Sequence, residues 1–244
     1  MRPLVLALVV FVLGCRESGI SSDPPMARAE GFLWVTVAPS KDFSHGLPQV
    51  VDIERRLPLK HDYYHEDPVT WVHEGTHYIN SNITREKGKQ GLYLLDGKAV
   101  ILNSPNLTLE QIAVAIPEKD RRTIYQTYLI DQRQWWNKEP LYLLNEWVAY
   151  GNGTACRKSL NKTGKDRIDT VRFALEMEVY VRHMASLARK DPAYKDIETL
   201  DAFIDWHGNR IRYLAGPEDT ELAASMLDNK TVPVGKVERM VPKK

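Results

Sequence analysis

The stretch Asp67-Pro68-Val69-Thr70-Trp71-Val72-His73-Glu74-Gly75-Thr76-His77 combines the start signal of a helix with a metal-binding pattern. Asp is favoured just before a helix because its side chain accepts the first free backbone N–H groups, and Pro is tolerated at the first helical position. We therefore expect a helix that begins at Pro68 and ends near Ile83. Apolar residues recur along one side of this segment, which predicts that the helix packs against a core.

His73 and His77 are four residues apart, so on a helix their side chains lie one above the other on the same face. Both imidazoles can then reach one metal ion. Glu74 lies about 100° around the helix from His73, where it can lean over a water molecule on that ion. His-Glu-x-x-His is typical of zinc peptidases, in which zinc makes this water acidic and the Glu takes its proton. Two histidines beside an incidental Glu are the alternative interpretation.

A catalytic zinc site needs a third protein ligand. No His follows His77 until His183, which excludes the extended metzincin pattern and leaves a Glu on a later helix. Glu146 is the best candidate, because it borders an apolar helix face within Leu143–Tyr150. A carboxylate there is unfavourable unless it is paired or bound to a metal. An ion pair between Glu146 and an arginine is the alternative, and Glu176 and Glu178 are the fallback ligands.

Two segments, His73-Glu74-Gly75-Thr76-His77 and Asn145-Glu146-Trp147-Val148-Ala149-Tyr150, together resemble the gluzincin group of zinc peptidases, in the style of its anthrax lethal factor-like members. The resemblance covers these two short segments only. It implies a zincin-like fold, zinc bound by His73, His77 and Glu146, and Glu74 as the general base. Such peptidases stabilise the oxyanion with a Tyr two turns before the Glu ligand. Glu139 occupies that position here, so Tyr142 and Tyr150 are the candidates for this role.

Four other histidines are further candidates for the site. His61 and His65 are also four residues apart, but Pro58 and Asp67-Pro68 around them argue against a stable helix. An exposed pair is the favoured interpretation, and contact with substrate is the alternative. His183 and His207 fall on expected helices, where a structural role is favoured over proton donation.

The remaining sequence predicts a small early sheet followed mainly by helices. Phe32–Val37 is β-branched and aromatic, which predicts a strand, and two apolar runs around Asp96-Gly97 predict a hairpin over Leu92–Leu102. Val50–Ile53 is interpreted as a short strand. Helices are expected at Leu107–Ala115, Arg121–Trp136, Pro140–Tyr150, Arg167–Lys190 and Ile197–Leu214, with Gly151 and Gly216-Pro217 as helix ends. The expected fold class is α+β, with a single domain.

The N-terminus has the pattern of a secretion signal. Leu4–Leu13 is an apolar run of ten residues, too short to span a bilayer. Val12-Leu13-Gly14-Cys15 resembles the bacterial lipobox, in which a small residue precedes a cysteine that becomes lipidated. We therefore expect secretion across the cytoplasmic membrane and a lipid anchor on Cys15 in the cell envelope. The alternatives are an ordinary cleaved signal with an incidental Cys15 or, in an oxidising compartment, a Cys15–Cys156 disulfide.

These features divide the chain into four regions. Residues 1–14 are expected to be the signal peptide, 15–30 a lipidated tether, 31–232 the zincin-like catalytic domain and 233–244 a loose basic tail. The chain has 244 residues, and 33 Lys plus Arg balance 32 Asp plus Glu. No basic stripe stands out, so nucleic acid is not an expected partner.

The predicted function is a zinc-dependent metallopeptidase that acts on a peptide or protein. The hairpin offers an edge strand with which an extended peptide could pair. The alternatives are a zinc hydrolase of a non-peptide amide or of cell-wall material, and a non-enzymatic lipoprotein with a structural metal. Glu74 distinguishes them, because only the hydrolases require it.

Overall fold

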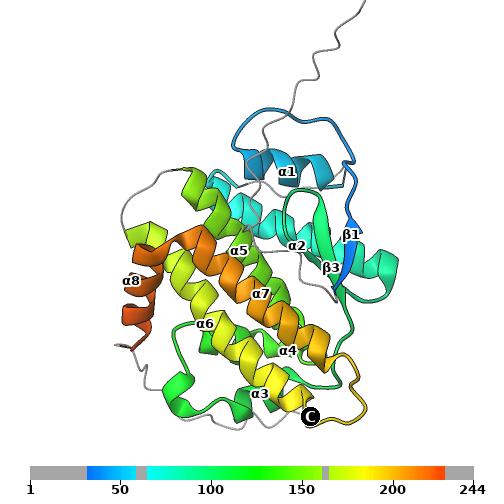
Figure 1. The fold of residues 1–244 in the computed structure, drawn as a ribbon, viewed down its shortest axis with the longest axis vertical. Coiled ribbons are helices and arrows are strands. Elements are labelled where there is room, and N and C mark those ends of the chain that lie inside the picture. The colour runs from blue at the N-terminus through cyan, green and yellow to red at the C-terminus, as the bar shows by residue number, and fades with distance from the viewer. Residues whose placement is uncertain (1–31, 59–64, 161–164, 229–244) are drawn as a thin grey trace, which may run out of the picture.

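The computed structural model describes residues 32–58, 65–160 and 165–228 (Figure 1). The expected signal peptide, tether and basic tail lie outside this part, as does His61. The elements, in chain order, are β1 (Leu33–Thr36), α1 (Pro48–Arg56), α2 (Pro68–Lys87), β2 (Gln90–Tyr93), β3 (Lys98–Leu102), α3 (Leu109–Ala115), a 3₁₀ turn (Glu118–Asp120), a π-helix (Gln126–Asp131), α4 (Arg133–Trp136), α5 (Tyr142–Ser159), α6 (Lys165–Ala188), α7 (Ile197–Ala215) and α8 (Pro217–Asp228). The molecule is mostly helical with one small sheet, which is compatible with the expected α+β class. None of the helices in the described residues has the length and apolar character to cross a bilayer.

Helix α2 begins where the sequence predicts. The Asp67 side chain accepts hydrogen bonds from the backbone N–H and the hydroxyl of Thr70, both at 2.9 Å. The helix continues one turn beyond the expected end at Ile83 and stops at Gly88, which has a left-handed φ of 65°. Gly adopts this conformation without steric cost, and its N–H caps the carbonyl of Thr84.

The expected hairpin is also present. Strands β2 and β3 are antiparallel, with Leu92 opposite Val100, and their connection contains Asp96 and Gly97 with φ of 51° and 69°. Strand β1 joins the other side of β3, so the strand order is β1-β3-β2. The sheet meets α2 through β2.

Two expectations about helices and strands are wrong. Val50–Ile53, which the sequence predicts as a strand, lies within α1. Pro48 starts this helix, and Ile53 is buried on the side of α1 that packs on α2. A Cβ on Gly75 of α2 would come within 2.3 Å of the Ile53 side chain, so the two helices are in close contact. Gly151 does not end α5, because it lies where α5 approaches α7: a Cβ there would be 2.9 Å from the His207 ring.

Two further boundaries differ from the expectation. Arg121–Trp136 is not one helix but a π-helix followed by the short helix α4. Gly216 does end α7, but Pro217 then starts α8, which the sequence interpretation missed. Proline is compatible with this position because the first helical N–H has no intrahelical acceptor.

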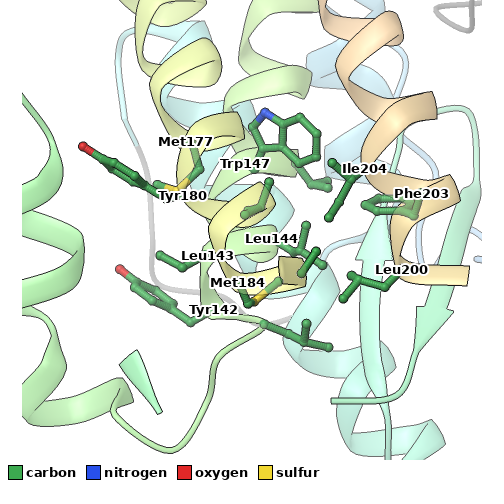
Figure 2. Close-up of a cluster of buried hydrophobic side chains, with 14 of the residues drawn as sticks. Tyr142, Leu143, Leu144, Trp147, Met177, Tyr180, Met184, Leu200, Phe203 and Ile204 are labelled. Atoms are coloured by element: carbon green, nitrogen blue, oxygen red, sulfur yellow. The ribbon is translucent and has the colours of Figure 1, made fainter. Parts of the chain in front are cut away.

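Helix α5 is the central helix of the molecule. It packs against α2, α6 and α7. Figure 2 shows how Leu143, Leu144 and Trp147 of α5 meet Met177 and Met184 of α6 and Leu200, Phe203 and Ile204 of α7 in the main core. This packing fixes the rotation of α5 about its axis and therefore directs Glu146, next to Trp147, toward α2.

Candidate metal centre

His73 and His77 lie one turn apart on α2, as their spacing predicts. Their Nε2 atoms are 3.1 Å apart, and the two rings meet edge to face with centroids separated by 4.8 Å. Both Nε2 atoms therefore converge on one point beside the helix.

Glu146 approaches this point from α5. Its Oε2 atom lies 3.4 Å from Nε2 of His73 and 3.5 Å from Nε2 of His77. Within residues 32–58, 65–160 and 165–228, these three side chains form a group of His, Cys, Asp or Glu that could hold a metal ion. The fallback residues Glu176 and Glu178 are elsewhere: Glu176 binds Ile124 and Tyr180, and Glu178 forms ion pairs with arginines.

The triangle formed by these three atoms fits a tetrahedral metal. Metal–ligand bonds of about 2.1 Å place two corners of a tetrahedron about 3.4 Å apart. The separations of 3.1, 3.4 and 3.5 Å are close to this value on all three edges. Two imidazole nitrogens and one carboxylate oxygen can thus occupy three corners and leave the fourth open.

Asn145 fixes the orientation of the His77 ring. The backbone N–H of Tyr93 in β2 can only donate, so the atom of Asn80 that it contacts at 2.6 Å is Oδ1. Nδ2 of Asn80 then donates to Oδ1 of Asn145 at 2.6 Å, and this same oxygen accepts from Nδ1 of His77 at 3.0 Å. The proton of neutral His77 is therefore on Nδ1, and the lone pair of Nε2 faces His73 and Glu146. Ring nitrogens opposite a metal are held in this way in metal sites.

The charges of the group support each other. Burial by itself raises the pKa of Glu146, but the hydrogen bonds and charges of His73 and His77 outweigh burial and hold this pKa well below its usual range. Burial lowers the pKa of His77, and Glu146 reverses this effect so that the net shift is upward. Glu146 is thus a carboxylate at neutral pH, the form that binds metal.

Glu74 lines the same pocket as the three candidate ligand side chains. This pocket has a volume of about 490 Å³ and is lined by residues of α2, α5, the π-helix and α4. A second pocket, also of about 490 Å³, lies toward the N-terminus of α2 and shares His73, Glu74 and Tyr128 with the first. Glu74 is partly exposed and borders both pockets, so its carboxylate is accessible from either side.

Tyr150 and Tyr142, the two candidates for stabilising the oxyanion, occupy different places. The Tyr150 ring packs on His73 with centroids 4.7 Å apart, and its hydroxyl is 2.6 Å from that of Tyr128. Tyr142 is a hydrogen-bond partner of Glu146, one turn before it on α5. Burial, followed by the charge of Glu146, raises the pKa of Tyr142. Burial also raises the pKa of Tyr128 and of Tyr150, so all three hydroxyls stay protonated at neutral pH. Tyr142 donates to Glu146, and one hydroxyl of the Tyr128–Tyr150 pair donates to the other, which leaves one O–H of that pair free to donate.

The sequence interpretation missed Tyr128, Asn145 and Asn80. Tyr128 comes from the π-helix and carries no spacing signal that connects it to the histidines. Asn145 and Asn80 do have a signal: one precedes Glu146 directly, and the other is three residues after His77. A metal-binding His needs an acceptor for its other nitrogen, so amides at these positions were candidates.

The other histidines lie away from the metal centre. His65 is exposed and its Nδ1 accepts from the N–H of Asp67 at 3.0 Å, while His183 contacts Asp120 at 3.3 Å. His207 is buried in the core, where burial lowers its pKa. Neither His183 nor His207 lines the pockets around the ligands.

The hairpin does not offer a free edge at β2. The N–H of Gly91 donates to the Thr84 hydroxyl at 3.0 Å, and that of Tyr93 donates to Asn80. The carbonyl of Tyr93 accepts from Nδ2 of Asn152 at 2.9 Å. Side chains of α2 and α5 thus occupy the backbone groups with which an extended peptide would pair, and the expectation of strand pairing at this hairpin is wrong.

Comparison with known proteins identifies no relative of this chain. No protein-family model, curated protein sequence or solved structure matches the chain. The resemblance to gluzincins stays a prediction based on the segments His73–His77 and Asn145–Tyr150.

Proposed function

We propose that the protein is a zinc-dependent hydrolase, and specifically a metallopeptidase. The observation that carries this proposal is the triangle of His73, His77 and Glu146, which is open toward a pocket that Glu74 also lines. Two His and one Glu with a fourth corner left open is a ligand set found in catalytic zinc sites. When bound there, zinc supplies a Lewis acid that makes a water molecule acidic near neutral pH and polarises a carbonyl.

Each protein group then has a defined task. Glu74 takes the proton of the attacking water and passes it to the leaving amine. The Tyr150 ring packs on His73, and its hydroxyl is hydrogen-bonded to that of Tyr128. One hydroxyl of this pair donates to the other, which leaves the second O–H to donate a hydrogen bond to the oxygen on which negative charge develops. Asn145 holds Nδ1 of His77 and so keeps Nε2 directed toward Nε2 of His73 and Oε2 of Glu146, where a metal would be held.

A purely structural metal is the alternative, and two features favour catalysis over it. Structural zinc sites have four protein ligands and are closed, whereas the group here has three members among the described residues and adjoins a pocket. A structural site also has no use for Glu74.

The test is the change Glu74→Gln in the zinc-loaded protein. We expect zinc content and thermal stability equal to those of the parent, and hydrolysis of peptides reduced by about 100-fold or more because the proton acceptor is lost. Glu86→Gln is the matched control, an exposed carboxylate near the end of the same helix. Equal turnover by the parent and Glu74→Gln would refute the proposed mechanism. Activity on non-peptide amides alone would refute the peptidase assignment.

A further inference from the structure

The candidate metal centre belongs to the middle one of three adjoining pockets along α2, which we together call the groove. The two pockets on either side of Tyr128 share residues with each other, and the ligand pocket shares Ser81, Trp136, Tyr142 and Asn145 with a third pocket. Along α2, the lining residues extend from Thr70 to Arg85, which corresponds to about 22 Å of helix. An extended chain of roughly six or seven residues covers this length.

The groove continues on both sides of the ligands. Thr70 and Gly153 line the part toward the N-terminus of α2, and Ser81 and Arg85 line the part toward its C-terminus. A chain that occupies both parts has its reacting bond in the middle and its ends outside. The geometry therefore suits an internal bond better than a terminal one.

The bound chain must be held mainly by its side chains. Backbone pairing with β2 is not available, because Thr84, Asn80 and Asn152 occupy the polar groups of its outer edge. Without strand pairing, affinity and selectivity come from the pockets that receive substrate side chains.

Trp136 provides the largest apolar surface of the groove. Its ring is stacked on that of Tyr142, with centroids 5.1 Å apart and an angle of 5° between the planes, and the residue is 42% exposed. It lines both the ligand pocket and the third pocket. Tyr78 also lines the ligand pocket and is 41% exposed. Because Tyr142 is buried, the stacking holds the Trp136 ring in place before any substrate arrives.

We propose that the groove takes internal segments of polypeptides and that Trp136 and Tyr78 select a large aromatic or aliphatic side chain close to the cleaved bond. This proposal rests on the peptidase function proposed above. An exposed aromatic surface that is already ordered loses little entropy on binding and gains from removing apolar area from water.

The experiment uses the zinc-loaded protein and a mixture of peptides that are acetylated at the N-terminus and amidated at the C-terminus. We expect cleavage at internal bonds next to Phe, Tyr, Trp, Leu or Met. Trp136→Ala should lower kcat/KM for these peptides by about 10- to 100-fold, the range for removing a large apolar contact. It should change kcat/KM little for a peptide with Ala at that position. Trp136→Phe should retain most of the preference.

Two further variants separate selection from damage to the fold. Trp135→Ala is the matched control, since Trp135 is 65% exposed and lines none of the three pockets, and we expect parent activity. Tyr78→Ala is a second test of the apolar surface and is used if Trp136→Ala proves unstable. The Tyr78 side chain is 41% exposed, so its removal leaves the core intact. Both should be compared with the parent for thermal stability and zinc content.

The outcomes are distinguishable. If no peptide, blocked or free, is cleaved in a manner that depends on Glu74, the proposed peptidase function fails. If free peptides are cleaved and blocked ones are not, the peptidase stands and the internal-bond inference is overturned. If blocked peptides are cleaved without preference, or if stable Trp136→Ala and Tyr78→Ala variants lose equal activity on aromatic and Ala-containing peptides, the role of this surface is overturned.

Discussion

The orientation of the His77 ring depends on a single amide oxygen. Oδ1 of Asn145 accepts from both His77 and Asn80, so the ligand is connected through Asn80 to the backbone of β2. Without this acceptor the His77 ring can rotate and exchange its tautomer. The positions of the ligand atoms are then less well defined before the metal binds.

We therefore predict that Asn145→Ala weakens zinc binding by about 10- to 100-fold while the protein stays folded. Competition with a coloured chelator measures the affinity, and circular dichroism checks the fold. Asn82→Ala, an amide change on α2 away from the pockets, should bind zinc as the parent does. Unchanged affinity in Asn145→Ala would show that the hydrogen bond does not position the ligand.

For single residues of the candidate site, the sequence predicts what the geometry of one helix determines. The convergence of His73 and His77 follows from 3.6 residues per turn and needs no tertiary information. Glu146 could be chosen because a carboxylate at an apolar border needs a cation. Tyr128 could not be predicted, since its place next to Tyr150 depends on how the π-helix segment packs on the remainder of the molecule.

Helix α6 positions the segment that carries Tyr128. The Glu176 carboxylate accepts from the N–H of Ile124 at 2.6 Å and from the Tyr180 hydroxyl at 2.8 Å. Tyr180 in turn accepts from the N–H of Arg122 at 3.0 Å. A carboxylate on α6 thus holds the chain just before the π-helix, although it does not reach the metal centre itself.

Glu176 should make the stability of the fold depend on pH. Burial raises its pKa above the usual value of 4.5, and the two hydrogen bonds only partly offset burial. Between pH 4.5 and the raised pKa, Glu176 is protonated in the folded protein and ionised in the unfolded chain. The free energy of unfolding therefore falls as pH rises from about 4.5 through the pKa of the folded state. Glu176→Gln removes this titration. We expect the stability of the variant relative to the parent to increase between pH 4 and pH 7, as measured by urea unfolding at both values. A constant difference would contradict the raised pKa.

The elements show where local signals suffice and where packing decides. The start of α2 and the hairpin follow from Asp67-Pro68 and Asp96-Gly97, whose effects act within a few residues. Gly151 resembles the glycine at a helix end, yet α5 continues through it. The glycine is required there by the close approach of His207 in α7, which leaves no room for a side chain. Val50–Ile53 has β-branched residues, but burial of Ile53 against α2 stabilises a helix instead.

We propose that the N-terminus anchors the protein to the cell envelope through a lipid on Cys15. Cys15→Ser removes the thiol to which the lipid would be attached, so the protein should move from the membrane fraction to the soluble fraction or remain unprocessed. Cys156→Ser is the control: Cys156 is buried in α5, and its loss should leave fractionation unchanged. If Cys15→Ser still sediments with membranes, the lipobox interpretation is wrong.

A metal bound at the centre would connect α2 to α5, two helices that pack directly on each other. His73 and His77 belong to one and Glu146 to the other, so a ligand that requires all three binds the folded state only. Zinc at 100 times its dissociation constant then stabilises the fold by about 2.7 kcal/mol. For a chain of this size, each kcal/mol raises Tm by about 2 to 4 °C, so zinc should raise Tm by roughly 5 to 11 °C.

Glu146→Ala should lose most of this zinc-induced rise, because two imidazoles alone hold zinc weakly. Glu178→Ala is the informative comparison: it removes a buried carboxylate paired with Arg182 and Arg212, so it should lower Tm with and without zinc and leave the difference between them intact. Thermal unfolding of the parent and both variants, in zinc and in chelator, measures the difference directly. If Glu146→Ala keeps the full rise in Tm while Glu178→Ala loses it, the third ligand comes from α6 rather than from α5.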